Sequence, residues 1–340
     1  MNEILDVGLE ITRWLQQNYP WLRGFMAFMS QMGRFEFYLV LVPIIYWAID
    51  KQLGRSLTYI LTFSDVTNNL LKHAFRGPRP YWLDQSVGLS SESTSYGIPS
   101  GHSQTAFIIY LYLAIWLRRR WVWALALLMV FLMGLSRVYL GVHFLHDVLA
   151  GYLVGLLILV GYLLWWRYLQ DNFRRRILGQ RLLLAIIIPL AFGLIYALVL
   201  YLIGQPDLSV AWSSYLPELE AESVQSMFSS LGALLGVGCG LVLEGSRVRF
   251  RAGGPIWKRA VRVILGLIGA VAFWRGLALV FPTDPLWLGL PLRALRYFLL
   301  GIWVSYYGPM VFVRLRLADA DPPPGIELTI RPLDRIQPPK

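Results

Sequence analysis

Long runs of apolar residues recur along most of this 340-residue chain, and short polar stretches separate them. A transmembrane helix needs roughly 17 to 25 mostly apolar residues. The segments that meet this requirement are 35–50, 53–72, 103–118, 121–139, 144–166, 182–204, 226–245, 262–281 and 292–313. The pattern therefore predicts an all-α, polytopic bundle of about nine transmembrane helices.

The two ends of the chain have a different pattern. In residues 1–34, leucines such as Leu5 and Leu9 alternate with Glu3, Asp6 and Glu10, which favours amphipathic helices at the membrane interface over a span. The last residues, 318–340, are too rich in proline for a helix and predict a loose tail. We divide the remainder into a core over 35–180 and additional transmembrane helices over 181–317.

The composition excludes two large classes of protein. Hydrophobic residues make up 56% of the chain and charged residues only 15%, whereas soluble domains have roughly 25% charged residues. With a mean hydropathy of +0.53, neither a soluble enzyme nor a disordered protein fits. Cys239 is the one cysteine and lies in an apolar run, which excludes a disulfide framework and a cysteine-based metal site.

The net charge of +11 comes mostly from arginines in the connections on one side of the predicted membrane. Arginines cluster after the third, fifth and seventh predicted spans, at 118–120, 174–176 and 247–251, so these connections and the C-terminus should be cytoplasmic. The acidic connection at 205–225 should lie outside. Nucleic acid is therefore not an expected partner. We expect an integral protein of a bacterial inner membrane or of the endoplasmic reticulum.

Three polar stretches fall at the outer ends of spans two, three and five. The first joins Lys72 to Arg79-Pro80, and by itself could simply anchor a helix end to lipid headgroups. The second is Pro99-Ser100-Gly101-His102, directly before a predicted helix. Free backbone N–H groups at a helix start bind anions, although for this motif taken alone a serine N-cap with an incidental histidine is the favoured explanation.

The third stretch contains Arg137, His143 and Asp147. The spacing of four residues places His143 and Asp147 on one helix face, where the carboxylate can orient the imidazole as a nucleophile. A structural Asp–His pair is the alternative. His146 should point about a quarter-turn away from this face, and we assign it no role.

These alternatives fail when the three stretches are taken together. Ionisable groups at membrane depth are costly and usually functional. The groups at this depth are three cations, a helix start, a His–Asp pair and a second histidine. Together they suit the binding of a tetrahedral oxyanion with two negative charges. Phosphoryl transfer needs chiefly positive charge and positioning around the phosphate oxygens.

In order, spacing and residue type, the three stretches resemble the signature motifs of the type 2 phosphatidic acid phosphatase family, in the superfamily of glucose-6-phosphatases and vanadium haloperoxidases. The resemblance implies a six-helix-type core and a metal-independent phosphatase without a cofactor. It also implies that His143 attacks phosphorus to form a phosphohistidine, that Asp147 orients it, and that His102 protonates the leaving oxygen and then activates water. The residues implied to hold phosphate are Lys72, Arg79, Ser100, Gly101 and Arg137.

The expected substrate is a lipid phosphate, such as phosphatidic acid or a polyprenyl diphosphate, because the motifs lie at headgroup depth. The nine-span layout is similar to the glucose-6-phosphatases, which leaves a soluble sugar phosphate as an alternative. A non-catalytic lipid-phosphate binding or transport protein is the third reading. The expected partners are membrane lipids, the phosphorylated substrate and the product inorganic phosphate. The last four spans carry no motif that we recognise.

Overall fold

The computed structural model describes residues 3–90 and 95–322. Within these ranges the regular structure is helical, apart from an isolated bridge between Phe250 and Ala320, which confirms the predicted all-α class. The α-helices are α1 (Glu3–Asn18), α2 (Arg23–Gln31), α3 (Phe35–Ile44), α4 (Lys51–Phe75), α5 (Pro80–Leu83), α6 (Gly101–Leu117), α7 (Arg120–Tyr139), α8 (Leu145–Tyr168), α9 (Gln170–Arg175), α10 (Leu178–Ile203), α11 (Leu216–Leu243), α12 (Ile256–Val271), α13 (Leu277–Val280), α14 (Leu286–Ile302) and α15 (Gly308–Arg314). Short 3-10 and π segments extend or join them: η1 (Pro20–Leu22), η2 (Ile45–Ile49), η3 (Gln85–Val87), η4 (Ser213–Tyr215), η5 (Glu244–Val248), η6 (Ala272–Gly276) and η7 (Trp303–Tyr307).

The chain is an integral membrane protein. In the described part of the chain, six helices are long and apolar enough to cross a membrane, and a seventh span results if the pair Pro20–Gln31 and Phe35–Ile49, bent by 53°, counts as one. Two predicted spans fall outside this set. α6 has only 17 residues, and α4 carries polar side chains such as Asp65, Asn68 and Asn69. The count of nine therefore stays a prediction.

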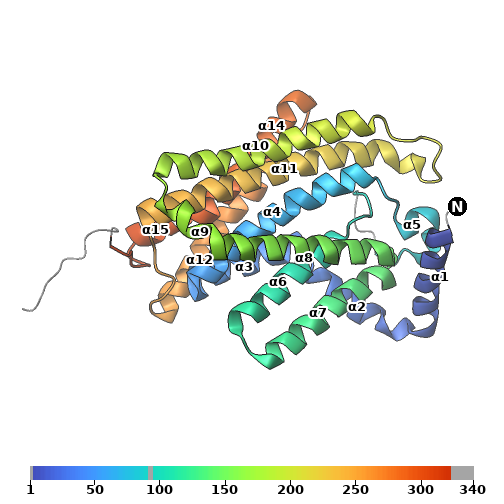
Figure 1. The fold of residues 1–340 in the computed structure, drawn as a ribbon, viewed down its shortest axis with the longest axis horizontal. Helices are drawn as coiled ribbons and strands as arrows, with labels where there is room; N and C mark the ends of the chain where they lie inside the picture. Colours follow the sequence, from blue (N-terminus) through green and yellow to red (C-terminus); the bar gives the residue numbers. More distant parts are fainter. Residues whose placement is uncertain (1–2, 91–94, 323–340) are drawn as a thin grey trace, which may run out of the picture.

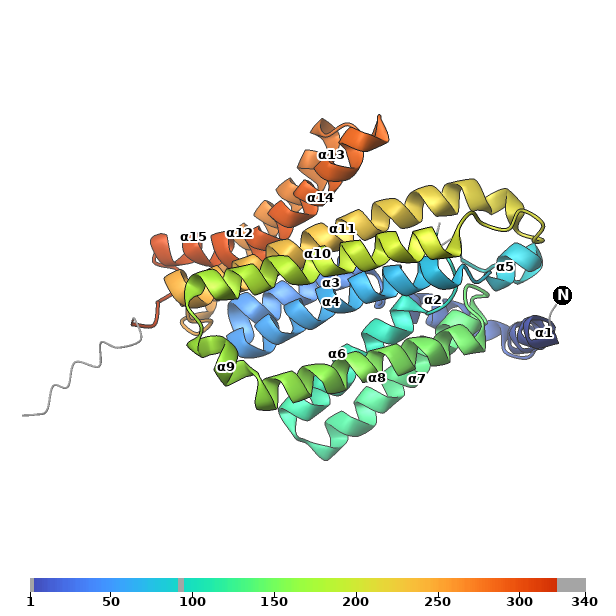
Figure 2. The same cartoon turned by 45° about the horizontal axis from the view of Figure 1, so that its top comes forward.

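α4 is the central helix of the bundle. In both views it lies between α10 and α11 on one side and α6 and α8 on the other (Figures 1 and 2). Polar side chains join it to both sides: Asn68 donates to Gln104 of α6 at 2.8 Å, and Asn69 donates to Ser230 of α11 at 2.8 Å. The C-terminal end of α4 is therefore held in place by both halves of the molecule.

α11 runs the length of the bundle and packs closely on α14. A Cβ atom added at Gly232 would overlap the carbonyl oxygen of Ala294, and one added at Gly236 would overlap that of Phe298. Small residues four apart let two membrane helices approach to backbone contact. α11 is thus firmly attached to the C-terminal helices while its other end reaches α5.

The N-terminal helices pack on the bundle. α2 lies against α7 and buries Met26, Met29 and Ser30. α1 is amphipathic and buries Gly8, Leu9 and Thr12. The end of the bundle near α1 and α5 is opposite the end that carries α9 and α15 (Figures 1 and 2). The segment 1–34 therefore contributes to the end of the molecule where the three motifs lie.

Candidate active site

Lys72 lies in the last turn of α4 and is almost fully buried. Its ammonium group donates to the backbone carbonyl of Tyr96 and, at 3.4 Å, to that of Gly97. The helix ends because Arg76 adopts a left-handed conformation with φ of 48°. The chain then turns back through Pro78 to place Arg79 beside Lys72.

Arg79 joins the first motif to the third. The residue is 2% exposed, and its guanidinium donates to the carbonyl oxygens of Ser95 at 2.6 Å and Val142 at 2.9 Å. The Nη1 atom also lies 3.3 Å from Nε2 of His143. A buried cation is therefore placed directly at the ring nitrogen of the candidate nucleophile.

The second motif forms the start of α6, as expected. Ser100 is the N-cap residue, and its hydroxyl accepts from the backbone N–H of Ser103 at 3.4 Å. The N–H of Ser100 donates to the carbonyl of Asp147 at 2.9 Å, which ties the second motif to the third. At Gly101 a Cβ would lie 3.0 Å from the side-chain oxygen of Asn68, so a larger residue would press on α4.

His102 occupies the first turn of α6 and has a free ring nitrogen. Its Nε2 atom is buried and forms no hydrogen bond with any residue that the structure describes. Its ring packs on Gly33, where a Cβ atom would overlap it. A buried imidazole with an open nitrogen is suited to exchange a proton with a bound substrate.

His143 and Asp147 form the predicted pair, with Nδ1 of the ring 3.2 Å from Oδ2 of the carboxylate. His143 lies in the turn before α8 rather than on the helix, because the same Oδ2 atom accepts from the N–H of Phe144 at 3.0 Å and begins α8 there. Burial lowers the pKa of His143 well below its ordinary value, and the charges of Arg79, Lys72 and Arg137 lower it further. The ring is therefore held neutral.

The expectation that His146 points away from this pair is wrong. Its Nε2 atom lies 3.2 Å from Oδ1 of Asp147, and its ring stacks on Phe144 with 5.3 Å between centroids. The stacking turns the side chain back along the first turn of α8. Asp147 thus contacts two histidines, one on each oxygen.

Arg137 is buried at the end of α7, where its Nη1 atom donates to the hydroxyl of Ser30. No sequence pattern pointed to Ser30 or Gly33 as site residues, because the segment 1–34 showed only an amphipathic pattern. In the part of the chain that the structure describes, no group of three or more His, Cys, Asp or Glu residues is placed to hold a metal ion.

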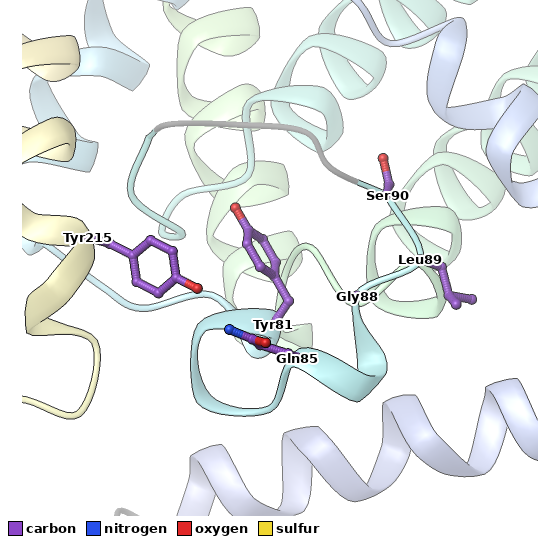
Figure 3. Close-up of a pocket in the computed structure, with 6 residues that line it drawn as sticks. All are labelled: Tyr81, Gln85, Gly88, Leu89, Ser90 and Tyr215. Atoms are coloured by element: carbon purple, nitrogen blue, oxygen red, sulfur yellow. The ribbon is translucent and has the colours of Figure 1, made fainter.

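A cavity of about 420 Å³ lies next to the third motif. Its lining combines residues after the first motif with the start of α11, and Figure 3 shows the ring of Tyr81 facing that of Tyr215. The lining residues are Tyr81, Gln85, Gly88, Leu89, Ser90 and Tyr215. Backbone bonds from Tyr81 to Gly141 at 3.3 Å and from Leu89 to Leu140 at 3.1 Å connect the cavity wall to the loop that carries His143.

Comparison with known proteins identifies the family. The family model described as "PAP2 superfamily" matches residues 53–174, and "PAP2 superfamily phosphatase, transmembrane extension" matches residues 228–320. Phosphatidylglycerophosphatase B of Bacillus subtilis is 34% identical over 152 residues, which cover 41% of this chain and 72% of that protein. The chain belongs to the PAP2 superfamily. The resemblance inferred from the three motifs is confirmed, and the protein is a phosphatase.

Two further relatives differ in how much of the chain they cover. Glucose-6-phosphatase catalytic subunit 1 of Rattus norvegicus is 29% identical over 299 residues, covering 76% of this chain and 80% of that protein. Lipid phosphate phosphatase delta of Arabidopsis thaliana is 28% identical over 153 residues, covering 41% of this chain but only 37% of the plant protein. The PAP2 phosphatase thus resembles the rat enzyme beyond the motif region.

Proposed function

We propose that this PAP2 phosphatase removes phosphate through a phosphohistidine formed on His143. The observation that carries the proposal is the arrangement of the His143 ring: Asp147 lies at Nδ1, and the other nitrogen, Nε2, lies beside Arg79. A neutral imidazole held in one orientation is an activated nucleophile. Nε2 forms the bond to phosphorus as the bond from phosphorus to the leaving oxygen breaks.

His102 moves the protons of both steps. In the first step its ring donates a proton to the leaving oxygen, which departs as an alcohol or a phosphate. In the second step the neutral His102 ring accepts a proton from water, the oxygen of that water attacks phosphorus, and the bond to His143 breaks. Inorganic phosphate is released. The buried, open Nε2 atom of His102 supports this role.

The phosphate oxygens are held by Lys72, Arg79 and Arg137 together with the Ser100 hydroxyl and Gly101 at the start of α6. The three cations are buried, and the charge of each lowers the pKa of the His143 ring. The start of α6 adds free N–H groups that favour an anion. Positive charge around the equatorial oxygens is the main requirement of phosphoryl transfer, so we expect hydrolysis without a divalent metal.

The substrate we propose is a lipid phosphate. The motifs lie at helix ends, where a lipid can present its headgroup while its chains remain in the bilayer. Two of the relatives are named for a lipid phosphate and a phosphatidylglycerophosphate. A polyprenyl diphosphate would fit the same site, since only its headgroup has to enter.

A soluble sugar phosphate is the second candidate, and the cavity favours it. A sugar needs several hydrogen-bonding groups for its hydroxyls, and Tyr81, Gln85, Ser90 and Tyr215 supply such groups close to the third motif. The long match to the rat glucose-6-phosphatase points the same way.

A comparison of kcat/KM in one set of mixed micelles separates the candidates. Phosphatidic acid, a polyprenyl diphosphate and glucose 6-phosphate are assayed in EDTA, with His143→Ala as the blank. We expect a lipid substrate to be preferred. A preference of more than about tenfold for the sugar phosphate, roughly 1.4 kcal/mol of transition-state binding, would replace the lipid proposal by the second candidate.

A further inference from the structure

Glu220, near the start of α11, binds three side chains of the motif region. Its Oε1 atom accepts from the hydroxyl of Tyr96 at 2.5 Å. Its Oε2 atom accepts from Arg76 at 2.8 Å and lies 2.9 Å from Nε2 of His73. Glu220 belongs to a helix that follows the catalytic motifs in the sequence and carries none of them. It therefore connects the C-terminal part of the chain to the end of α4.

Tyr96 passes this connection on to the phosphate-binding cations. Its side chain is completely buried. Burial and the bond to Glu220 raise the pKa of the Tyr96 phenol, so that its hydroxyl stays a donor. The backbone carbonyl of the same residue accepts from Lys72 and, at 3.3 Å, from Nη2 of Arg79. One residue thus holds Glu220 with its side chain and two cations with its backbone.

An apolar contact supports the polar one. Tyr215 stacks on Trp82 with 5.5 Å between ring centroids, and Trp82 packs against the ring of Tyr96. Leu216 and Leu219 of α11 complete this buried cluster. The first turn of α11 is therefore docked on the segment between the first and second motifs by both kinds of contact.

We propose that Glu220 is a positioning residue of the phosphate site, acting through Tyr96 on Lys72 and Arg79. The inference rests on the phosphate-binding role proposed for these two cations. Two buried cations that repel each other need fixed acceptors to stay in one geometry, and small errors in placement are costly to catalysis. The C-terminal helices, whose function the sequence left open, then complete the site by holding Glu220 in place.

Two variants test the connection from its two ends. Glu220→Gln keeps the shape of the side chain but loses its charge, and Tyr96→Phe removes the hydroxyl while keeping the carbonyl. Each should raise KM and the inhibition constant of inorganic phosphate by about tenfold, the effect of losing one charge-assisted hydrogen bond. The double variant should be little worse than Tyr96→Phe alone, because Glu220→Gln weakens, and Tyr96→Phe removes, the same hydrogen bond between Glu220 and Tyr96.

The matched control is Glu218→Gln, an exposed carboxylate two residues away on the same helix. It should leave KM and phosphate inhibition unchanged. A purely structural effect is distinguishable, because a smaller folded fraction lowers the apparent kcat but leaves KM and the inhibition constant as they were. If Glu220→Gln does not yield folded protein, the KM and the phosphate inhibition constant of Tyr96→Phe alone test the positioning role.

Failure of this inference can be told apart from failure of the proposed function. Lys72→Met is measured in the same assays. If it weakens phosphate inhibition while Glu220→Gln and Tyr96→Phe do not, the positioning role of Glu220 is wrong and the phosphate site stands. If Lys72→Met also leaves phosphate inhibition unchanged, the role of Lys72 in the proposed site is wrong, and the inference falls with it.

Discussion

The four histidines of the chain have four different surroundings, and these separate their roles. His73 is buried between Tyr196 and Glu220, His146 stacks on Phe144, and His102 has an open ring nitrogen. Only His143 combines a carboxylate at one nitrogen with an arginine at the other among the described residues. The surroundings of each ring, not its place in the sequence, thus point to the nucleophile and the general acid.

Replacing the two catalytic candidates should have different consequences for different leaving groups. His143→Ala should abolish phosphate release from every substrate, because no bond to phosphorus can form. His102→Ala should lower kcat/KM by about 100-fold for an alkyl phosphate, which needs a proton on departure, and much less for p-nitrophenyl phosphate. Steady-state rates on both substrates measure the difference. Retention of more than a few per cent of activity by His143→Ala would show that another group attacks.

The charge state of His143 can be observed without a substrate. Burial and three neighbouring cations lower its pKa, so the ring should stay neutral at a pH where an ordinary histidine, with a pKa near 6.5, is half protonated. NMR of ¹³C-labelled histidine in detergent, assigned with His143→Gln, measures this. Because an anion offsets the cations, added inorganic phosphate should raise the pKa. A titration near 6.5 that ignores phosphate would contradict the buried, cation-lined site.

At the scale of helices, the contact between α6 and α8 positions the second motif against the third. A Cβ atom at Gly151 of α8 would lie 2.6 Å from the carbonyl oxygen of Ser100. Gly151→Ala should therefore push α8 away from the start of α6, destabilise the protein by about 1–3 kcal/mol and lower kcat. Thermal unfolding and steady-state kinetics test this prediction.

Gly161→Ala is the control for this contact. It lies on the same helix, and outside the adjoining backbone of that helix no described atom lies within 4 Å of a Cβ atom placed there. This change should leave activity intact and stability unchanged or slightly higher, since alanine favours a helix over glycine. Equal losses of stability and kcat in the two variants would mean that the effect of Gly151→Ala does not come from the α6–α8 contact.

The sequence predicted where the helices lie along the chain, but not which residues of distant helices contact each other. Apolar length located the long helices, and residue spacing located the pair His143–Asp147, because both are local properties. The position of Ser30 beside Arg137, the turn of His146 onto Phe144 and the reach of Glu220 to Tyr96 depend on how distant helices pack. The periodicity of one helix shows which face is buried but not which residue lies opposite.

For the whole molecule, the polar groups divide between the two ends of the bundle. The motifs, α1 and α5 lie at one end, and α9 and α15 lie at the other (Figures 1 and 2). α9 contains Arg174 and Arg175, and the short turn between α6 and α7 adds Arg118 and Arg119. Arginine clusters mark cytoplasmic connections, whereas Lys72, Arg79 and Arg137 are buried in the site and carry no such information.

This division predicts that the active site opens on the periplasmic, extracellular or lumenal face. In a Cys239→Ala background, a cysteine at exposed Ser86 of η3 should react with a membrane-impermeant maleimide in sealed, right-side-out membranes. A cysteine at exposed Arg175 of α9 should react only after permeabilisation, because the arginine clusters predict that this end lies in the cytoplasm. The opposite labelling pattern would place His143 on the cytoplasmic side, and the substrate would then have to be sought among cytoplasmic phosphates and inner-leaflet lipids.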